Sequence, residues 1–195
     1  MHQSDRVGNA PPPFADKGVR DLLVAIGNQG EAFARDDLKL AFGAPGRYGA
    51  VRPDNSISGV ITQATAAGFE RMLVVCHLGK LVKLGSGSLD PDPSQSFGRV
   101  ETLVACALEA GADMLLLRQL LGCVSTDAAT AALLEADQLS TTMRVLERRI
   151  QATLDANTPP DLRLEWVCFS RLAEAFTLVA QSTTAFGLVR EWRHS

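Results

Sequence analysis

The residues that could do chemistry gather in three polar, glycine-bearing stretches. They are Gly27-Asn28-Gln29-Gly30, Arg52-Pro53-Asp54-Asn55-Ser56, and the segment from His77 to Lys83. Each follows a short apolar run typical of a strand, so each is expected at the carboxyl end of a strand. In an open α/β sheet, ligands bind beyond those ends, where glycine lets the backbone approach closely and free N–H groups attract a carboxylate or phosphate. The pattern favours a small anionic ligand.

His77 is the most informative of these residues. It directly follows the apolar run RMLVVC and stands two residues before Gly79. A histidine at that place can act as an acid, a base or a hydrogen-bond donor near neutral pH. The alternative is a structural histidine that caps the strand end, and the sequence leaves both interpretations open.

Further charged residues surround His77 in the sequence. Lys80 and Lys83 are three residues apart, which places them on one face of a short helix. Arg99 and Glu101 open the next helix, and Arg99 could clamp a carboxylate with two hydrogen bonds. Together with His77 the lysines form a positive cluster in a chain of formal charge −3, which suits an anionic ligand. For each of these cations the alternative is an ordinary solvated surface residue.

Composition and missing motifs disfavour several other functions. The sequence has no G-x-G-x-x-G, P-loop or G-x-S-x-G pattern, which argues against NAD binding and a serine hydrolase. Three histidines and four scattered cysteines without a C-x-x-C pair give no metal site and no disulfide framework. The acidic balance gives no reason to expect nucleic acid or a membrane surface as partner. Without a membrane-spanning run or the apolar region of a signal peptide, we expect a cytoplasmic protein.

The elements that position these residues alternate between strand and helix. Apolar runs predict strands at 22–26, 48–51 and 71–76, separated by helices at 31–42 and 57–68. This alternation predicts an α/β fold with a mainly parallel sheet and crossover helices. Because helices cover both faces of such a sheet, Leu73, Val74 and Val75 should be buried.

The second half of the chain predicts extra C-terminal helices and a hairpin. Helices are expected at 99–112 and 114–121, after Ser125, after Ser140 and from about Ser182. Two short segments, 162–169 and 176–180, could pair with each other as a hairpin. Residues 1–18 contain Pro11-Pro12-Pro13 and are expected to form an irregular arm, which leaves 19–195 as a single α/β domain.

Residues 55–101 resemble a known family. The segment CHLGKLVKLGSG at 76–87 resembles G-H-I-G-K-L-V-K-x-A-x-G of the CbiD family, the cobalt-precorrin-5B (C1)-methyltransferases of anaerobic cobalamin synthesis. Upstream, Asn55, Gly68-Phe69 and LVV resemble the family's N-F-I-G, helix, G-F-x-x-x-L-x-V pattern without a gap. Gly27–Gly30 resembles its G-N-x-G loop, and Arg99 and Glu101 match its arginine and glutamate. The resemblance is strong over about residues 20–112 and general afterwards.

The resemblance implies S-adenosylmethionine as methyl donor and a cobalt-precorrin, a corrinoid with many carboxylate side arms, as acceptor. It implies that His77 assists by hydrogen bonding or proton removal. The sequence leaves open which loop binds the donor and which the acceptor. Because the Gly27–Gly30 loop follows the first strand of the sheet, we expect Gly27, Asn28 and Gly30, together with Asn55, on the donor side. The residues expected on the acceptor side are Gly79, Lys80, Lys83, Arg99 and Glu101.

The chain also departs from the family pattern. Pro91-Asp92-Pro93 stands where the family has Thr-His-Ser, and Phe97 stands where it has an aspartate. The family's chain is nearly twice as long, so we expect this one to correspond to its C-terminal part, with a separate chain able to supply the N-terminal domain. Three hypotheses follow: a methyltransferase, a non-catalytic corrinoid- or anion-binding relative, and an unrelated anion-binding module with the same fold.

Overall fold

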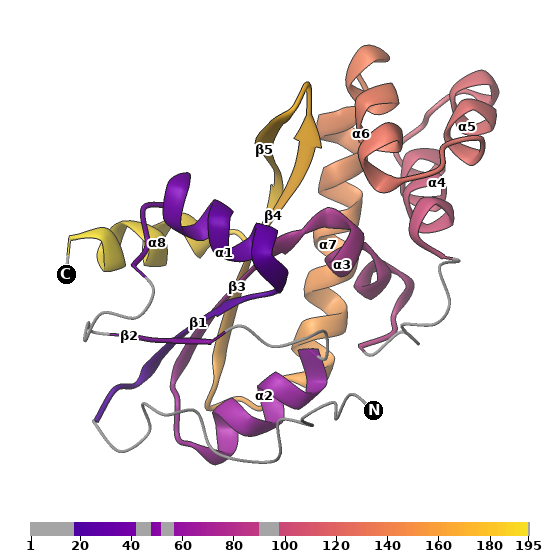
Figure 1. The fold of residues 1–195 in the computed structure, drawn as a ribbon. Coiled ribbons are helices and arrows are strands. Elements are labelled where there is room, and N and C mark those ends of the chain that lie inside the picture. Colours follow the sequence, from indigo (N-terminus) through magenta and orange to yellow (C-terminus); the bar gives the residue numbers. More distant parts are fainter. Residues whose placement is uncertain (1–17, 42–47, 52–56, 90–97, 195) are drawn as a thin grey trace, which may run out of the picture.

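A computed structural model describes residues 18–41, 48–51, 57–89 and 98–194. Its centre is a five-stranded sheet in the order β2-β1-β3-β4-β5 (Figure 1). Neighbouring strands among β1–β4 run parallel, and β5 pairs antiparallel with β4. The bounds are β1 Asp21–Ala25, β2 Tyr48–Val51, β3 Arg71–His77, β4 Arg163–Leu172 and β5 Ala175–Gln181. The mainly parallel α/β sheet and its hairpin are confirmed.

β3 lies in the middle of the sheet and is buried on both faces. Leu73, Val74 and Val75 are at most 2% exposed, as predicted. Because side chains alternate across a strand, Leu73 and Val75 enter one core and Val74 enters the other. This burial fixes the position of His77, the last residue of the strand.

Helices cover both faces of the sheet. On one face, α1 (Gly27–Asp36) and α8 (Ala185–Arg193) pack over a core that includes Phe33, Phe169 and Trp192. On the other face lie α2 (Ile57–Ala66), α3 (Leu78–Leu81), a 3₁₀ turn η2 (Val82–Ser86) and α7 (Leu139–Asn157). None of the described helices has the length and apolar character needed to cross a membrane.

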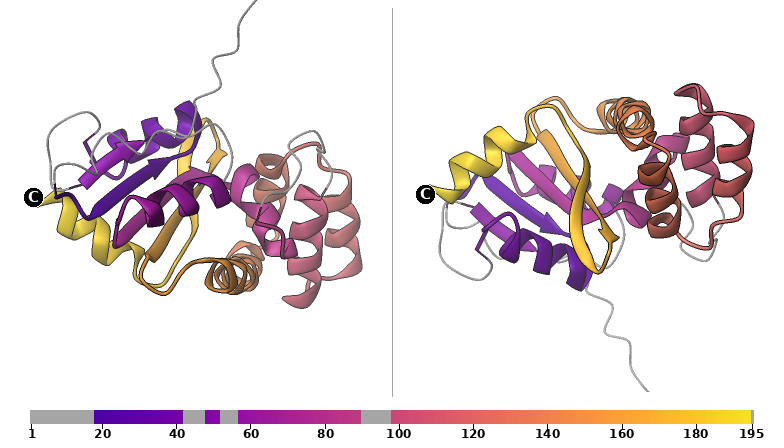
Figure 2. Two further views of the ribbon diagram at one scale, coloured as in Figure 1. Left: turned by 90° about the horizontal axis from the view of Figure 1, so that it is seen from below. Right: turned by 90° about the horizontal axis from the view of Figure 1, so that it is seen from above.

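The extra C-terminal helices form a group beside the sheet. Figure 2 shows α4 (Arg99–Glu109), α5 (Met114–Leu121) and α6 (Thr126–Glu135) at the end of the molecule away from the C-terminus. Asp113 and Ser125 cap α5 and α6 by accepting hydrogen bonds from backbone N–H groups. The predicted cap Ser140 is wrong, because α7 begins two residues earlier than expected, at Leu139, and its N-cap is Gln138.

The bounds of α1 and α8 also differ from expectation. The helix expected at 31–42 runs from Gly27 to Asp36, and the following apolar residues Leu38 and Leu40 are buried outside it. The last helix starts at Ala185, because Ser182 still donates its backbone N–H to Trp166 at the end of the hairpin. Nearly all of the predicted arm lies outside the described residues, so the division into 1–18 and 19–195 stays a prediction.

Candidate functional site

A pocket of about 300 Å³ lies at the carboxyl end of β3. Residues from four helical elements and the strand end meet there: Gln29, His77, Gly79, Lys80, Arg99, Val100, Val124, Ser125, Thr126 and Asp127. This is the edge at which an α/β sheet binds its ligands. The structure therefore brings His77, Gly79, Lys80 and Arg99, predicted from scattered motifs, to one place.

His77 has a hydrogen-bond partner on each ring nitrogen. Its Nδ1 accepts the backbone N–H of Gly79 at 3.0 Å, and its Nε2 lies 2.8 Å from Asp127 Oδ1. Since Nδ1 is an acceptor, Nε2 carries the proton and donates a hydrogen bond to the Asp127 carboxylate. His77 thus has a structural role, but it caps the N-terminus of α3 rather than the end of the strand. Proton removal by this ring would require one of the two bonds to break.

Asp127 belongs to the site and was missed by the sequence analysis. Its Oδ1 accepts hydrogen bonds from the Ser170 hydroxyl at 2.5 Å, from the Arg171 backbone N–H at 3.1 Å and from His77. Burial raises the pKa of the Asp127 carboxyl, but these hydrogen bonds and the nearby His77 outweigh it and set the pKa below its ordinary value. An acidic residue in the first turn after the predicted cap Ser125 was the available signal.

The lowered pKa of Asp127 predicts a loss of stability in acid. In the unfolded chain this carboxyl titrates near pH 3.9, about the value of a free aspartate. Its folded pKa lies below that, so its contribution is fully present above the unfolded pKa and is lost as pH falls through the folded pKa. We expect the stability difference between the wild type and Asp127→Asn, measured by urea unfolding, to shrink as pH falls from 7 to about 3. A difference that stays constant with pH would contradict this assignment.

The two lysines lie in different environments. Lys80 is exposed and lines the pocket, whereas Lys83 is only 6% exposed. The alternative of an ordinary solvated surface residue is therefore wrong for Lys83. The chain tightens into η2 after Leu81, and η2 packs against α4 and α7, which covers Lys83. The positive charge of the pocket comes from Lys80 and Arg99.

Arg99 and Glu101 separate into two roles at the start of α4. Arg99 lines the pocket, and its Nε is buried without a hydrogen-bond partner. Across the described residues the guanidinium makes no hydrogen bond or ion pair. The Glu101 carboxylate instead accepts the Gly98 backbone N–H at 2.9 Å and closes the N-terminus of the helix. Glu101 thus has a capping role in this structure.

The predicted glycine loop is the first turn of α1. Gln29 from this turn lines the pocket, while Gly30 is buried against the β3 backbone. The N-cap residue Ile26 provides no side-chain hydrogen bond to this helix start. Gly27 has φ +74°, a conformation that favours glycine. Asn55, Pro91-Asp92-Pro93 and Phe97 lie outside the described residues.

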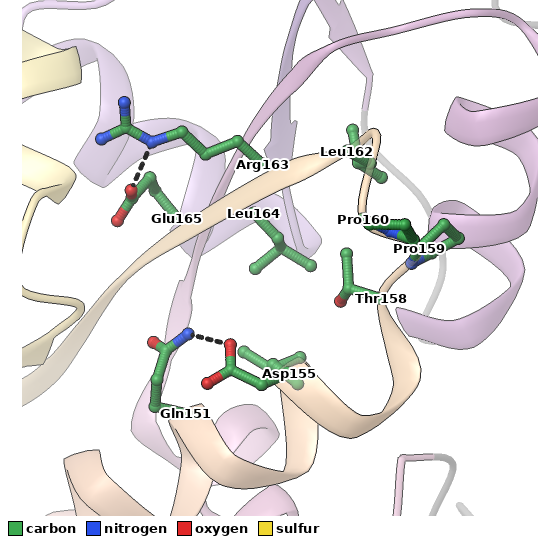
Figure 3. Close-up of a pocket in the computed structure, with 10 residues that line it drawn as sticks. Gln151, Asp155, Thr158, Pro159, Pro160, Leu162, Arg163, Leu164 and Glu165 are labelled. Atoms are coloured by element: carbon green, nitrogen blue, oxygen red, sulfur yellow. Dashed lines mark hydrogen bonds and ion pairs between the residues drawn. The ribbon is translucent and has the colours of Figure 1, made fainter.

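Another pocket, of about 340 Å³, lies at the amino-terminal ends of the parallel strands, where β4 begins (Figure 3). Its charged and amide side chains are paired with one another: Gln151 donates to Asp155 at 2.7 Å, and Arg163 donates to Glu165 at 2.9 Å, while the buried Thr158 hydroxyl has no hydrogen-bond partner among the described residues. The pocket at His77, where the charged Arg99 has no partner in the described part of the chain, is therefore the stronger candidate. Within the described ranges, no three His, Cys, Asp or Glu side chains are grouped to hold a metal ion.

Fold and pocket together define an α/β protein with a pocket at the carboxyl ends of a mainly parallel sheet, lined by the cationic side chains Lys80 and Arg99. Residues 94–178 match the family model described as "CbiD, C-terminal domain". Relatives named cobalt-precorrin-5B C(1)-methyltransferase also match. The one from Photorhabdus laumondii is 31% identical over 131 residues, which are 67% of this chain and 33% of the relative.

Two further relatives differ in how much of the chain they match and in their identity to it. The relative from Listeria monocytogenes serovar 1/2a is 26% identical over 181 residues, which are 91% of this chain and 46% of the relative. The relative from Gloeobacter violaceus is 34% identical over 112 residues, 55% of this chain and 31% of the relative. These matches confirm the resemblance to the CbiD family. The chain spans less than half the length of the relatives it matches.

Proposed function

We propose that this chain binds a cobalt-precorrin and takes part in methyl transfer from S-adenosylmethionine to that corrinoid. The reaction would be C1-methylation of cobalt-precorrin-5B in cobalamin biosynthesis. The names of its relatives support the reaction class. The observation that carries the proposal for this chain is the pocket at the end of β3, which Lys80 and Arg99 make positive. Arg99 has no hydrogen-bond or ion-pair partner in the part of the chain that the structure describes.

The state of Arg99 supports an anionic ligand on energetic grounds. Leaving a buried donor such as its Nε unsatisfied costs about 1–3 kcal/mol. A carboxylate in the pocket would accept from this nitrogen and from its neighbour on the same guanidinium, in the two-bond geometry that arginine favours. Carboxylate arms are what a cobalt-precorrin presents in abundance.

The start of α1 is the place we propose for the methyl donor. When bound, S-adenosylmethionine supplies an electrophilic methyl group on a sulfonium ion. The residues present fit part of this molecule, because the α1 N-terminus has no side-chain cap and its Gln29 reaches the same pocket as Arg99. Gly27, Asn28 and Gly30 remain the proposed donor-side residues on this helix, and Asn55 remains proposed from the resemblance.

A second candidate function is corrinoid binding without turnover. Its support is the state of His77, whose two ring nitrogens both have partners and leave no free base. Methyl transfer from a sulfonium depends chiefly on aligning donor and acceptor, so an engaged histidine is compatible with both candidates. Titration calorimetry with S-adenosylhomocysteine and, separately, with a carboxylate-bearing cobalt-corrinoid distinguishes them. Binding of both supports methyl transfer, and binding of the corrinoid alone supports the second candidate.

We expect Arg99→Gln to weaken corrinoid binding about 10- to 100-fold, the value of one or two hydrogen bonds to a charged group. Lys80→Gln should have a smaller effect that grows at low salt, because an exposed charge is screened by ions. The matched control is Arg118→Gln, an exposed arginine on α5. Wild-type affinity in Arg99→Gln, or equal losses in Arg118→Gln, would remove Arg99 from the site.

A further inference from the structure

Four elements converge on the His77 ring. His77 is the last residue of β3. Its ring accepts a hydrogen bond from the Gly79 N–H at the start of α3 and donates one to Asp127 in the first turn of α6. Asp127 in turn holds Ser170 and Arg171 of β4. A single carboxylate oxygen therefore links the α6 wall of the pocket to two neighbouring strands of the sheet.

The packing at this junction leaves little freedom. A Cβ atom placed on Gly79 would lie 3.1 Å from Thr126 Oγ1 and 3.2 Å from His77 Nδ1. The start of α3 and the start of α6 are thus in close contact around the imidazole. Lys80 follows Gly79 directly, so the conformation of this junction determines where the Lys80 side chain enters the pocket.

The hydrogen bond between Gly79 and His77 depends on the tautomer of the imidazole. Gly79 can donate to Nδ1 only while Nδ1 carries no proton. A carboxylate that accepts from Nε2–H favours that tautomer, as carboxylate partners of histidine do elsewhere. Asp127 is itself oriented by the hydroxyl of Ser170, a fully buried residue. The chain of hydrogen bonds runs from the sheet through Asp127 and His77 to Gly79.

We infer that Asp127 is a positioning residue: it holds His77 in the Nε2–H tautomer and thereby fixes α3 and Lys80 at the anion-binding pocket. This inference rests on the proposed function for its binding readout. It assigns Asp127 a role opposite to that of its charge, since a carboxylate in an anion-binding pocket repels the ligand by simple electrostatics. The two roles therefore predict opposite changes in ligand affinity when Asp127 is replaced.

The test compares two substitutions of the same residue. Asp127→Asn removes the charge but keeps an oxygen that accepts from His77, Ser170 and the Arg171 N–H. Asp127→Ala removes charge and acceptor together. If Asp127 positions the pocket, Asp127→Ala should bind a carboxylate-bearing cobalt-corrinoid at least fivefold more weakly, while Asp127→Asn keeps or improves the wild-type affinity. If both variants bind more tightly to a similar degree, Asp127 acts only as a charge and the inference fails.

A spectroscopic readout separates this inference from the proposed function. Nitrogen-15 NMR of the imidazole should show the Nε2–H tautomer for His77 in the wild type and in Asp127→Asn, and a mixture of tautomers in Asp127→Ala. Asp113→Ala is the control, because Asp113 is also an aspartate at a helix start but caps only α5. It should leave the His77 signals unchanged. An Nδ1–H tautomer in the wild type, or an unaltered spectrum in Asp127→Ala, would overturn the inference even if no corrinoid binds. A changed spectrum without corrinoid binding would refute the proposed function alone.

Discussion

Asp21→Ala is expected to lower the free energy of unfolding by about 2–3 kcal/mol, the upper range for hydrogen bonds to a charged group. Asp21 is 5% exposed at the start of β1. Its carboxylate accepts from Arg71 Nε at 2.7 Å, from Arg71 Nη2 at 2.5 Å and from Trp192 Nε1 at 3.0 Å. The alanine would leave the Nε–H and Nη2–H groups of Arg71 and the indole N–H of Trp192 without their acceptor. Urea unfolding monitored by tryptophan fluorescence measures the loss.

Glu191→Ala supplies the matched control on the same arginine. Glu191 accepts from Arg71 at 2.8 Å, but half of its side chain is exposed. A solvated ion pair contributes only about 0–1 kcal/mol, so this variant should stay close to the wild type. Equal losses in the two variants would show that burial does not set the strength of this cluster.

Gly30→Ala is expected to destabilise the protein by about 2–3 kcal/mol, a typical cost of forcing an extra group into a packed interior. A Cβ atom on Gly30 would lie 2.8 Å from the Val75 carbonyl oxygen. That oxygen also accepts the Ile26 backbone N–H at 2.9 Å, so it cannot move without breaking a hydrogen bond between the strand region and α1. Thermal and urea unfolding should both show the loss.

Gly187→Ala tests whether the Gly30 effect comes from packing rather than from glycine itself. Gly187 is exposed in α8, and a Cβ atom there would meet nothing within 4 Å. Alanine is favoured over glycine in a helix by about 0.5–1 kcal/mol, so this variant should be slightly more stable than the wild type. If Gly30→Ala is also neutral or stabilising, α1 does not pack on β3 as closely as described.

The strands and most helices could be predicted because their signals are local. The apolar run at 71–76 is long enough to identify a strand buried on both faces, and Asp21–Ala25 carries the same signal. Helix starts were harder to predict. Glycines at Gly27 and Gly30 indicate a turn, but packing of Phe33 against the sheet brings this segment into α1. Tertiary contacts therefore outweigh the local preference of glycine.

The site was predicted only in part, because its partners are far apart in the sequence. His77, Lys80 and Arg99 were found through their positions after a strand and before a helix. Asp127 lies 50 residues beyond His77, and nothing in the alanine-rich segment around it indicates that it faces a histidine. Lys83 was misplaced because a 3₁₀ turn follows α3, and helical spacing alone does not show where a helix tightens.

The sheet order has a consequence for the way this chain folds during synthesis. β1, β2 and β3 come from residues 21–77, but the strand that pairs with the other side of β3 starts only at Arg163. While the ribosome makes residues 78–162, the apolar edge of β3 has no strand partner. Pairings over such a sequence distance slow folding and leave an edge open to association with other chains. The nascent chain is thus most vulnerable to aggregation during this interval, before β4 emerges and closes the edge.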